Sequence, residues 1–82
     1  MDLIKLHKIK EFALEQMDKW GIDDWKFVWD TRAVRRYGQC RYSKKEIGIT
    51  KVLANLNTIE ETKDVVLHEI AHALTGPGHG HD

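Results

Sequence analysis

The segment 58–77 constrains the fold more than any other stretch, because it carries the signals for both ends of one helix. Thr58 and Glu61 have the spacing of a capping box, in which each side chain satisfies a backbone amide that the helix leaves free. Gly76 and Pro77 mark the other end, since glycine adopts the left-handed cap and proline cannot continue a helix. Between these signals, apolar residues recur at helical spacing, at Val66, Ile70 and Leu74. The sequence therefore predicts an amphipathic helix here.

A second amphipathic helix is predicted near the N-terminus, from Leu3 to Trp20. Asp2 is placed to cap its start, and Gly21 follows where its C-terminus would lie. The apolar positions again recur in steps of three and four, at Leu6, Ile9, Ala13, Met17 and Trp20. This helix is expected to pack one face on the core.

The middle third of the chain has a period of two. In WKFVWD, aromatic residues alternate with other residues, which is typical of a strand. The run TRAVRRYG stops at Gly38 and resumes as CRYS, and a turn then leads into IGIT, with Ile47 and Ile49 expected to face inward. Short connections join neighbouring antiparallel strands, so a three-stranded antiparallel sheet is predicted. The following VLANLN is expected to be a loop or a short turn, packed by Leu53 and Leu56.

Length and composition place these elements in one α+β domain, residues 1–82: an N-terminal helix, a three-stranded antiparallel sheet and a C-terminal helix. A chain of 82 residues has no room for a second core, and its formal net charge is zero. The single cysteine, Cys40, cannot form an internal disulfide. No apolar run approaches the roughly 20 residues that span a membrane. We therefore expect a soluble, cytoplasmic (intracellular) monomer with no membrane partner.

The C-terminal helix contains His68-Glu69-Ile70-Ala71-His72, which matches the H-E-x-x-H motif. Histidines four residues apart lie on one helix face, and both rings can reach one ion at about 2.0 Å. Glu69 points about 100° around the axis, so it suits a general base beside the ion rather than a ligand. The motif predicts a Zn²⁺ site with His68 and His72 as ligands. The alternative is a structural histidine pair without metal.

A catalytic zinc needs a third protein ligand and one open position. The H-E-x-x-H-x-x-G-x-x-H plan does not apply, because Thr75 and Gly78 occupy its glycine and histidine positions. His79, beyond the turn TGPG, is the leading candidate, and its alternative is a residue of a frayed tail. His81 is a second candidate for the ligand, and its alternatives are a solvent-exposed residue or a residue of the outer shell. Asp64, one turn before His68, is either a hydrogen-bond acceptor for that ring or a residue that stabilises the helix dipole.

These motifs resemble the SprT-like family, whose pattern is H-E-x-x-H-A, a loop, and then a histidine followed by glycine. The chain reads LHEIAHA and then HG at 79–80, and upstream it has a helix, the Trp-containing strand WKFVWD, the stretch RRYGQCRY and IGIT in the family's order. The resemblance implies a small zincin-like zinc metalloprotease, a hydrolase of protein or peptide substrates. It implies that His68, His72 and His79 are zinc ligands and that Glu69 is the catalytic base.

The resemblance also raises the question of DNA, because the family includes Spartan, which cleaves proteins crosslinked to DNA. Arg35, Arg36 and Arg41 make the sheet region locally basic, as either a solvated face or a nucleic-acid contact. The sequence lacks the cysteine zinc ribbon of larger members. The family pattern continues past the His-Gly, whereas this sequence stops at Asp82, so we expect either a complete short domain or one trimmed at its C-terminus.

A rival interpretation is a non-catalytic zinc-containing module that binds DNA or protein. A closed site in which His81 joined the other three histidines would have no open position for water. A hydrolase of another substrate class would use the same zinc chemistry, so the motif alone does not choose the bond that is cleaved.

Overall fold

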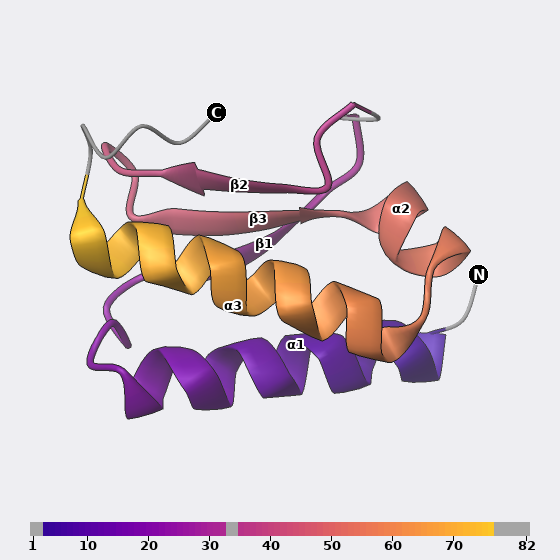
Figure 1. The fold of residues 1–82 in the computed structure, drawn as a ribbon, viewed down its shortest axis with the longest axis horizontal. Coiled ribbons are helices and arrows are strands. Elements are labelled where there is room, and N and C mark those ends of the chain that lie inside the picture. The colour runs from indigo at the N-terminus through magenta and orange to yellow at the C-terminus, as the bar shows by residue number, and fades with distance from the viewer. Residues whose placement is uncertain (1–2, 33–34, 77–82) are drawn as a thin grey trace.

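The computed structural model describes residues 3–32 and 35–76, which form a sheet with two long helices side by side on one face (Figure 1). The predicted α+β class is confirmed. No helix in these two ranges is long and apolar enough to cross a membrane. In chain order the elements are α1 (Leu3–Lys19), β1 (Lys26–Asp30), β2 (Gly38–Arg41), β3 (Glu46–Thr50), α2 (Lys51–Leu56) and α3 (Ile59–Thr75).

The sheet is mixed rather than purely antiparallel, which corrects the predicted pairing. The strand order is β1-β3-β2, with β3 antiparallel to β2 and parallel to β1. The expectation that a short connection joins two antiparallel neighbours is met by residues 42–45, which connect β2 to β3. β1 and β2, by contrast, are not neighbours, because β3 lies between them. The sequence of β3 suits this central position, because its residues 47–50 are all buried, whereas β1 and β2 remain partly exposed.

The core lies between the sheet and the two long helices. Ile47 and Ile49 of β3 are fully buried there, which confirms that they face inward. Figure 1 shows α3 running along the strands, with α1 beside it. The buried cluster consists of Leu6, Ile9, Ala13, Met17, Ile22, Ile47, Ile49, Ala54, Val66 and Ile70.

The helix α1 ends just before the glycine that was predicted to cap it. Gly21 has a positive φ of 77°, and the amide of Ile22 donates to the carbonyl of Met17 at 2.9 Å. These are the features of a Schellman cap, whose hydrophobic contact is here made inside the core. Trp20 departs from the predicted apolar stripe, because it is 51% exposed. The predicted cap Asp2 lies outside the described residues.

The segment after β3, predicted as a loop or a short turn, forms the short helix α2. It follows Thr50 directly, and Thr50 is tied down by its amide, which donates to the carbonyl of Tyr37 at 2.8 Å, and by its hydroxyl, which donates to the carbonyl of Arg36. Ala54 turns into the core. Six residues are too few to show a helical period, but the absence of glycine and proline from KVLANL was a usable signal.

The start of α3 confirms the predicted capping box. The amide of Glu61 donates to the hydroxyl of Thr58 at 3.1 Å, and the amide of Thr58 donates to the Glu61 carboxylate at 3.0 Å. The hydrogen bond from the backbone of Thr58 has the largest effect on the pKa of Glu61, and the bond with the Thr58 hydroxyl adds to it. Together they hold this pKa below its ordinary value of 4.5.

Two substitutions test this cap. Thr58→Ala is expected to lower the free energy of unfolding by about 1 kcal/mol. Because the folded state favours the Glu61 carboxylate, its contribution is complete above its ordinary pKa and is lost as the pH falls through the lowered pKa. In urea unfolding, Glu61→Gln should therefore differ most from the wild type near neutral pH and converge with it in acid. Glu60→Gln, in the same turn, is the control, and an equal pH effect there would contradict the assignment.

Candidate metal centre

His68 and His72 lie one turn apart on α3, and their rings converge. The two Nε2 atoms are 3.0 Å apart, and the ring planes meet at 83°. Two nitrogens that share a tetrahedral zinc, each at about 2.0–2.1 Å, are separated by about 3.3 Å. The rings would need to open only slightly to admit an ion. The pair therefore fits two of the ligand positions of a zinc site.

The candidate third ligand, His79, and the alternative, His81, lie outside the described residues. Within residues 3–32 and 35–76, no group of three histidine, cysteine, aspartate or glutamate side chains is arranged to hold a metal ion. The described part of the centre thus provides two imidazoles. The remaining ligands stay a prediction.

Glu69 is buried, with 2% of its surface exposed, while the neighbouring His68 is exposed. Its side chain packs against β2 at Gly38, which pairs with Ile49 and so faces the helix layer. A Cβ atom at Gly38 would lie 2.9 Å from both Cγ and Oε2 of Glu69, and 2.8 Å from Cγ1 of Val65. Gly38 therefore makes the space that the glutamate occupies.

Sequence reasoning treated Gly38 only as a break between two extended runs and missed this role. A glycine inside a strand often marks a close approach of another group to the backbone, which was the available signal. The partner, however, lies on a helix far along the chain, and the sequence alone does not identify it.

Tyr42 anchors the last turn of α3 beside the histidine pair. Its hydroxyl donates to the carbonyl oxygen of His72 at 2.9 Å, and its ring lies edge-on to Trp25 with centroids 6.0 Å apart. This contact also escaped the sequence analysis, because it joins residues 30 positions apart. It fixes the backbone of a candidate ligand to the turn that follows β2.

Cys40 lies close to the same glutamate but is not an activated thiol. Burial raises the pKa of Cys40, a hydrogen bond with Tyr42 lowers it, and the charge of Glu69 raises it again. The net effect is an increase from the ordinary value, so the neutral thiol predominates at neutral pH. The structure gives no support to cysteine-based nucleophilic chemistry at this position.

A cleft of about 540 Å³ opens beside His68 and Glu69. Asp64 lines it from α3, and Arg35 and Arg36 line it from the segment that leads into β2. Asp64 thus shares the cleft with His68, as expected from its place one turn earlier. Its hydrogen bond to the ring stays a prediction.

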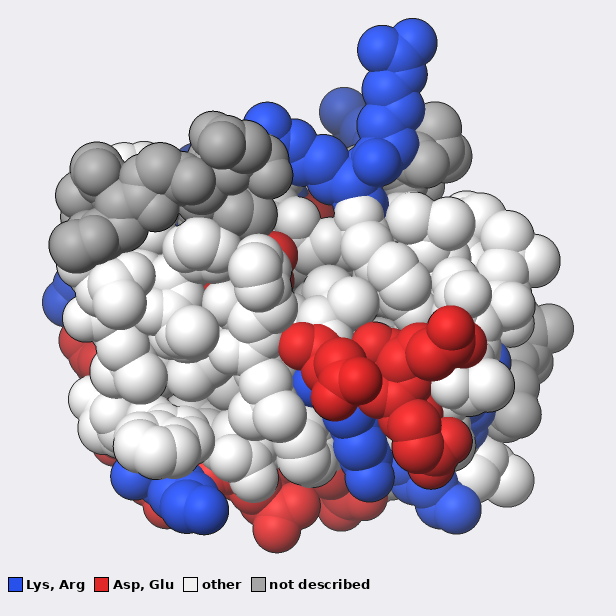
Figure 2. All heavy atoms as spheres, viewed as in Figure 1, with Lys and Arg blue, Asp and Glu red and all other residues white. Residues whose placement is uncertain are grey.

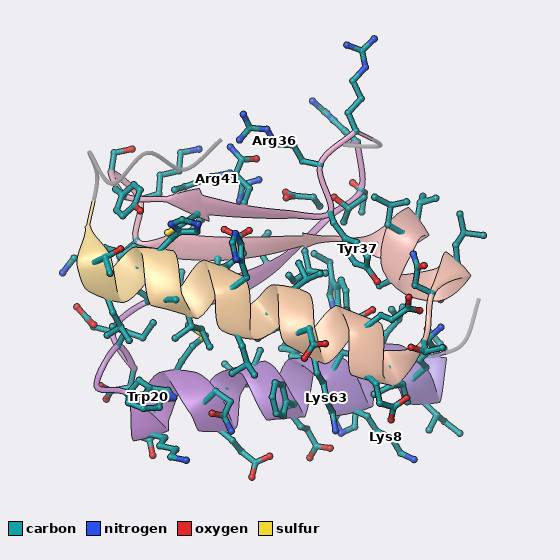
Figure 3. The ribbon with its side chains drawn as sticks, viewed as in Figure 1. Lys8, Trp20, Arg36, Tyr37, Arg41 and Lys63 are labelled. Carbon is teal, nitrogen blue, oxygen red and sulfur yellow. The ribbon has the colours of Figure 1, made fainter. Side chains whose placement is uncertain are left out.

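Arg41, the third residue of the predicted basic surface, does not line this cleft. It forms ion pairs with Asp30 and, at 3.5 Å, with Glu46, and its side chain is 22% exposed. The ion-paired side chains of Arg41 and Asp30 lie against Gly48, where a Cβ would lie 2.8 Å from Nη1 of Arg41. Since Ile47 and Ile49 face the core, Gly48 and this ion-pair cluster lie on the opposite face of the sheet. Figure 3 shows Arg36 and Arg41 extending from different segments.

Comparison with known proteins bears on the identity of this centre. The sequence profile of the SprT-like family matches residues 6–82. Searches of curated proteins and of solved structures found no match. The matched range includes all three described strands and the whole of α3. It therefore confirms the resemblance carried by RRYGQCRY and LHEIAHA. The chain belongs to the SprT-like family, whose domains are related to zinc metallopeptidases.

Proposed function

We propose that this protein is a zinc-dependent metallopeptidase that hydrolyses peptide bonds in protein or peptide substrates. The observation that carries the proposal is the convergence of His68 and His72 at 3.0 Å, with the buried carboxylate of Glu69 beside them. His68, His72 and His79 would hold the ion. Zinc in such a site would polarise a peptide carbonyl and lower the pKa of a water molecule.

Glu69 is the residue proposed to move the proton. Its carboxylate accepts a proton from the attacking water and then delivers that proton to the leaving amine nitrogen. The packing against Gly38 limits the positions that the carboxylate can take. A general base gains from such restriction, because proton transfer requires a hydrogen-bonding distance to the water.

The sheet offers a place for an extended peptide. β2 is an edge strand of the described sheet, and one of its residues, Gly38, contacts Glu69. A substrate that added to this edge would form main-chain hydrogen bonds with β2 and would pass close to the candidate centre. This arrangement supports a peptide as the substrate over a small molecule.

Zinc binding is tested by metal analysis and by titration of the metal-free protein with Zn²⁺. The wild type should bind one equivalent. His72→Ala and His79→Ala should each weaken binding by more than the roughly 10–100-fold that loss of an outer-shell partner costs. His81→Ala is the control and should bind zinc like the wild type.

Two outcomes would count against the proposal. Failure of the wild type to take up zinc would remove its basis. Equal losses for His79→Ala and His81→Ala would indicate a closed four-histidine site with no position for water, and hence the rival non-catalytic module that binds DNA or protein.

A further inference from the structure

The cleft beside the candidate centre has a cationic wall that the proposed chemistry does not use. Arg35 and Arg36 line the same cavity of about 540 Å³ as His68 and Glu69. Both arginines are exposed, and neither forms an ion pair with an acidic side chain in the described part of the chain. By contrast, Arg41 is paired on the other face of the sheet. Two guanidinium groups are thus available next to the place where a bond would be cleaved.

The backbone that carries these arginines is held at defined points. The carbonyl of Arg36 accepts a hydrogen bond from the hydroxyl of Thr50, a residue that is 1% exposed. The next residue, Tyr37, shares a hydrogen bond of 2.6 Å with the hydroxyl of Thr62, which is fully buried on α3. Figure 3 shows Tyr37 directed toward the interior and Arg36 directed away from it. The cationic wall is therefore attached to both β3 and α3.

The surroundings of the cleft favour a single carboxylate over a long polyanion. Asp64 and Glu69 lie in the cleft with the two arginines, so the cavity as a whole is not strongly positive. Glu60 and Glu61 continue the acidic surface over the first turn of α3, and Figure 2 shows acidic side chains gathered there. A nucleic-acid strand leaving the cleft along the helix would meet this negative charge. A carboxylate side chain needs only the arginine wall, and guanidinium groups bind carboxylates in a two-bond geometry.

We propose that Arg35 and Arg36 bind an acidic side chain of the substrate, so that the enzyme prefers peptides with glutamate or aspartate close to the cleaved bond. This inference rests on the proposed peptidase function and specifies its substrate class. The residues determine specificity and take no part in the proton transfer assigned to Glu69.

The test uses the zinc-loaded full chain and a library of peptides blocked at both ends, with cleavage products identified by mass spectrometry. Glutamate should be favoured over glutamine at one position by about tenfold, as expected for hydrogen bonds to a charged group. In the double variant Arg35→Gln/Arg36→Gln, that ratio should fall to about one. Arg32→Gln makes the same arginine-to-glutamine replacement at one position outside the cleft lining and should keep the wild-type ratio.

A binding measurement separates this inference from the peptidase proposal. Zinc-loaded Glu69→Gln should bind a fluorescent glutamate peptide more tightly than its glutamine twin, and the arginine substitutions should remove the difference. If this preference appears but the zinc-loaded wild type cleaves no peptide, the peptidase proposal fails and the acidic-ligand assignment stands. Equal binding of the two peptides overturns the assignment. It is also overturned if the arginine substitutions weaken binding of a single-stranded oligothymidylate and leave the peptide ratio unchanged.

Discussion

Replacing Glu69 with glutamine is expected to abolish peptide hydrolysis while leaving zinc content unchanged. The amide has nearly the same shape as the carboxylate but cannot accept the proton of the attacking water. General base catalysis contributes roughly 10²–10⁴-fold to rate, so kcat/KM should fall at least 100-fold. The measurement is the cleavage rate of an unfolded protein substrate, with zinc determined by elemental analysis on the same preparation.

Glu60→Gln is the matched control, because it makes the same chemical change on the exposed first turn of α3. It should keep wild-type activity. A Glu69→Gln protein that retained both zinc and full activity would show that another group takes the proton. Loss of zinc together with activity would indicate instead that Glu69 supports the metal site.

A methyl group added at Gly38 is expected to damage catalysis without removing the metal ligands. In Gly38→Ala, the new Cβ would lie 2.9 Å from Cγ and Oε2 of Glu69, which is closer than real contacts allow, so the glutamate must move. A displacement of about 1 Å in a catalytic group can cost about 100-fold in rate. Overpacking should also lower the free energy of unfolding by about 1–3 kcal/mol. Activity, zinc affinity and urea unfolding would each be measured.

Two companion variants separate the steric effect on Glu69 from a general loss of stability. Gly38→Ala/Val65→Ala removes the clash with Val65, the nearest contact at 2.8 Å, but keeps the clash with Glu69. It should therefore relieve that steric strain without recovering activity. Gly21→Ala, at a position with φ of 77° and open space around it, should lower stability and leave activity intact. Full activity in Gly38→Ala would contradict the role assigned to the glycine.

The sequence predicted those elements whose signals are local. The capping box at Thr58 and the glycine at position 21 located two helix ends, and both ends are confirmed by their hydrogen bonds. Alternation in IGIT identified the two isoleucines of the core. The pairing of β1 with β3 could not be read in the same way, because strand neighbours are chosen by packing across the sheet rather than by adjacent residues.

The candidate site shows the same division between local and distant information. The histidine pair follows from four-residue spacing on one helix, and its convergence needed only that helix to form. The burial of Glu69 against Gly38, and the hydrogen bond from Tyr42 to His72, depend on how β2 docks on α3. No periodicity connects those positions, so the sequence could supply the candidate reacting residues but not the residues that position them.

The hydrogen bond between Tyr42 and the carbonyl of His72 has a consequence for how function arises as the chain folds. A helix carrying both histidines could hold a metal early, as soon as its own turns form. The contacts of Glu69 and of the His72 backbone instead form only after chain segments about 30 residues away have packed against α3. Under the proposed function, metal capture and catalytic competence would thus be separable stages, and a partly folded chain could carry zinc without being able to cleave its neighbours.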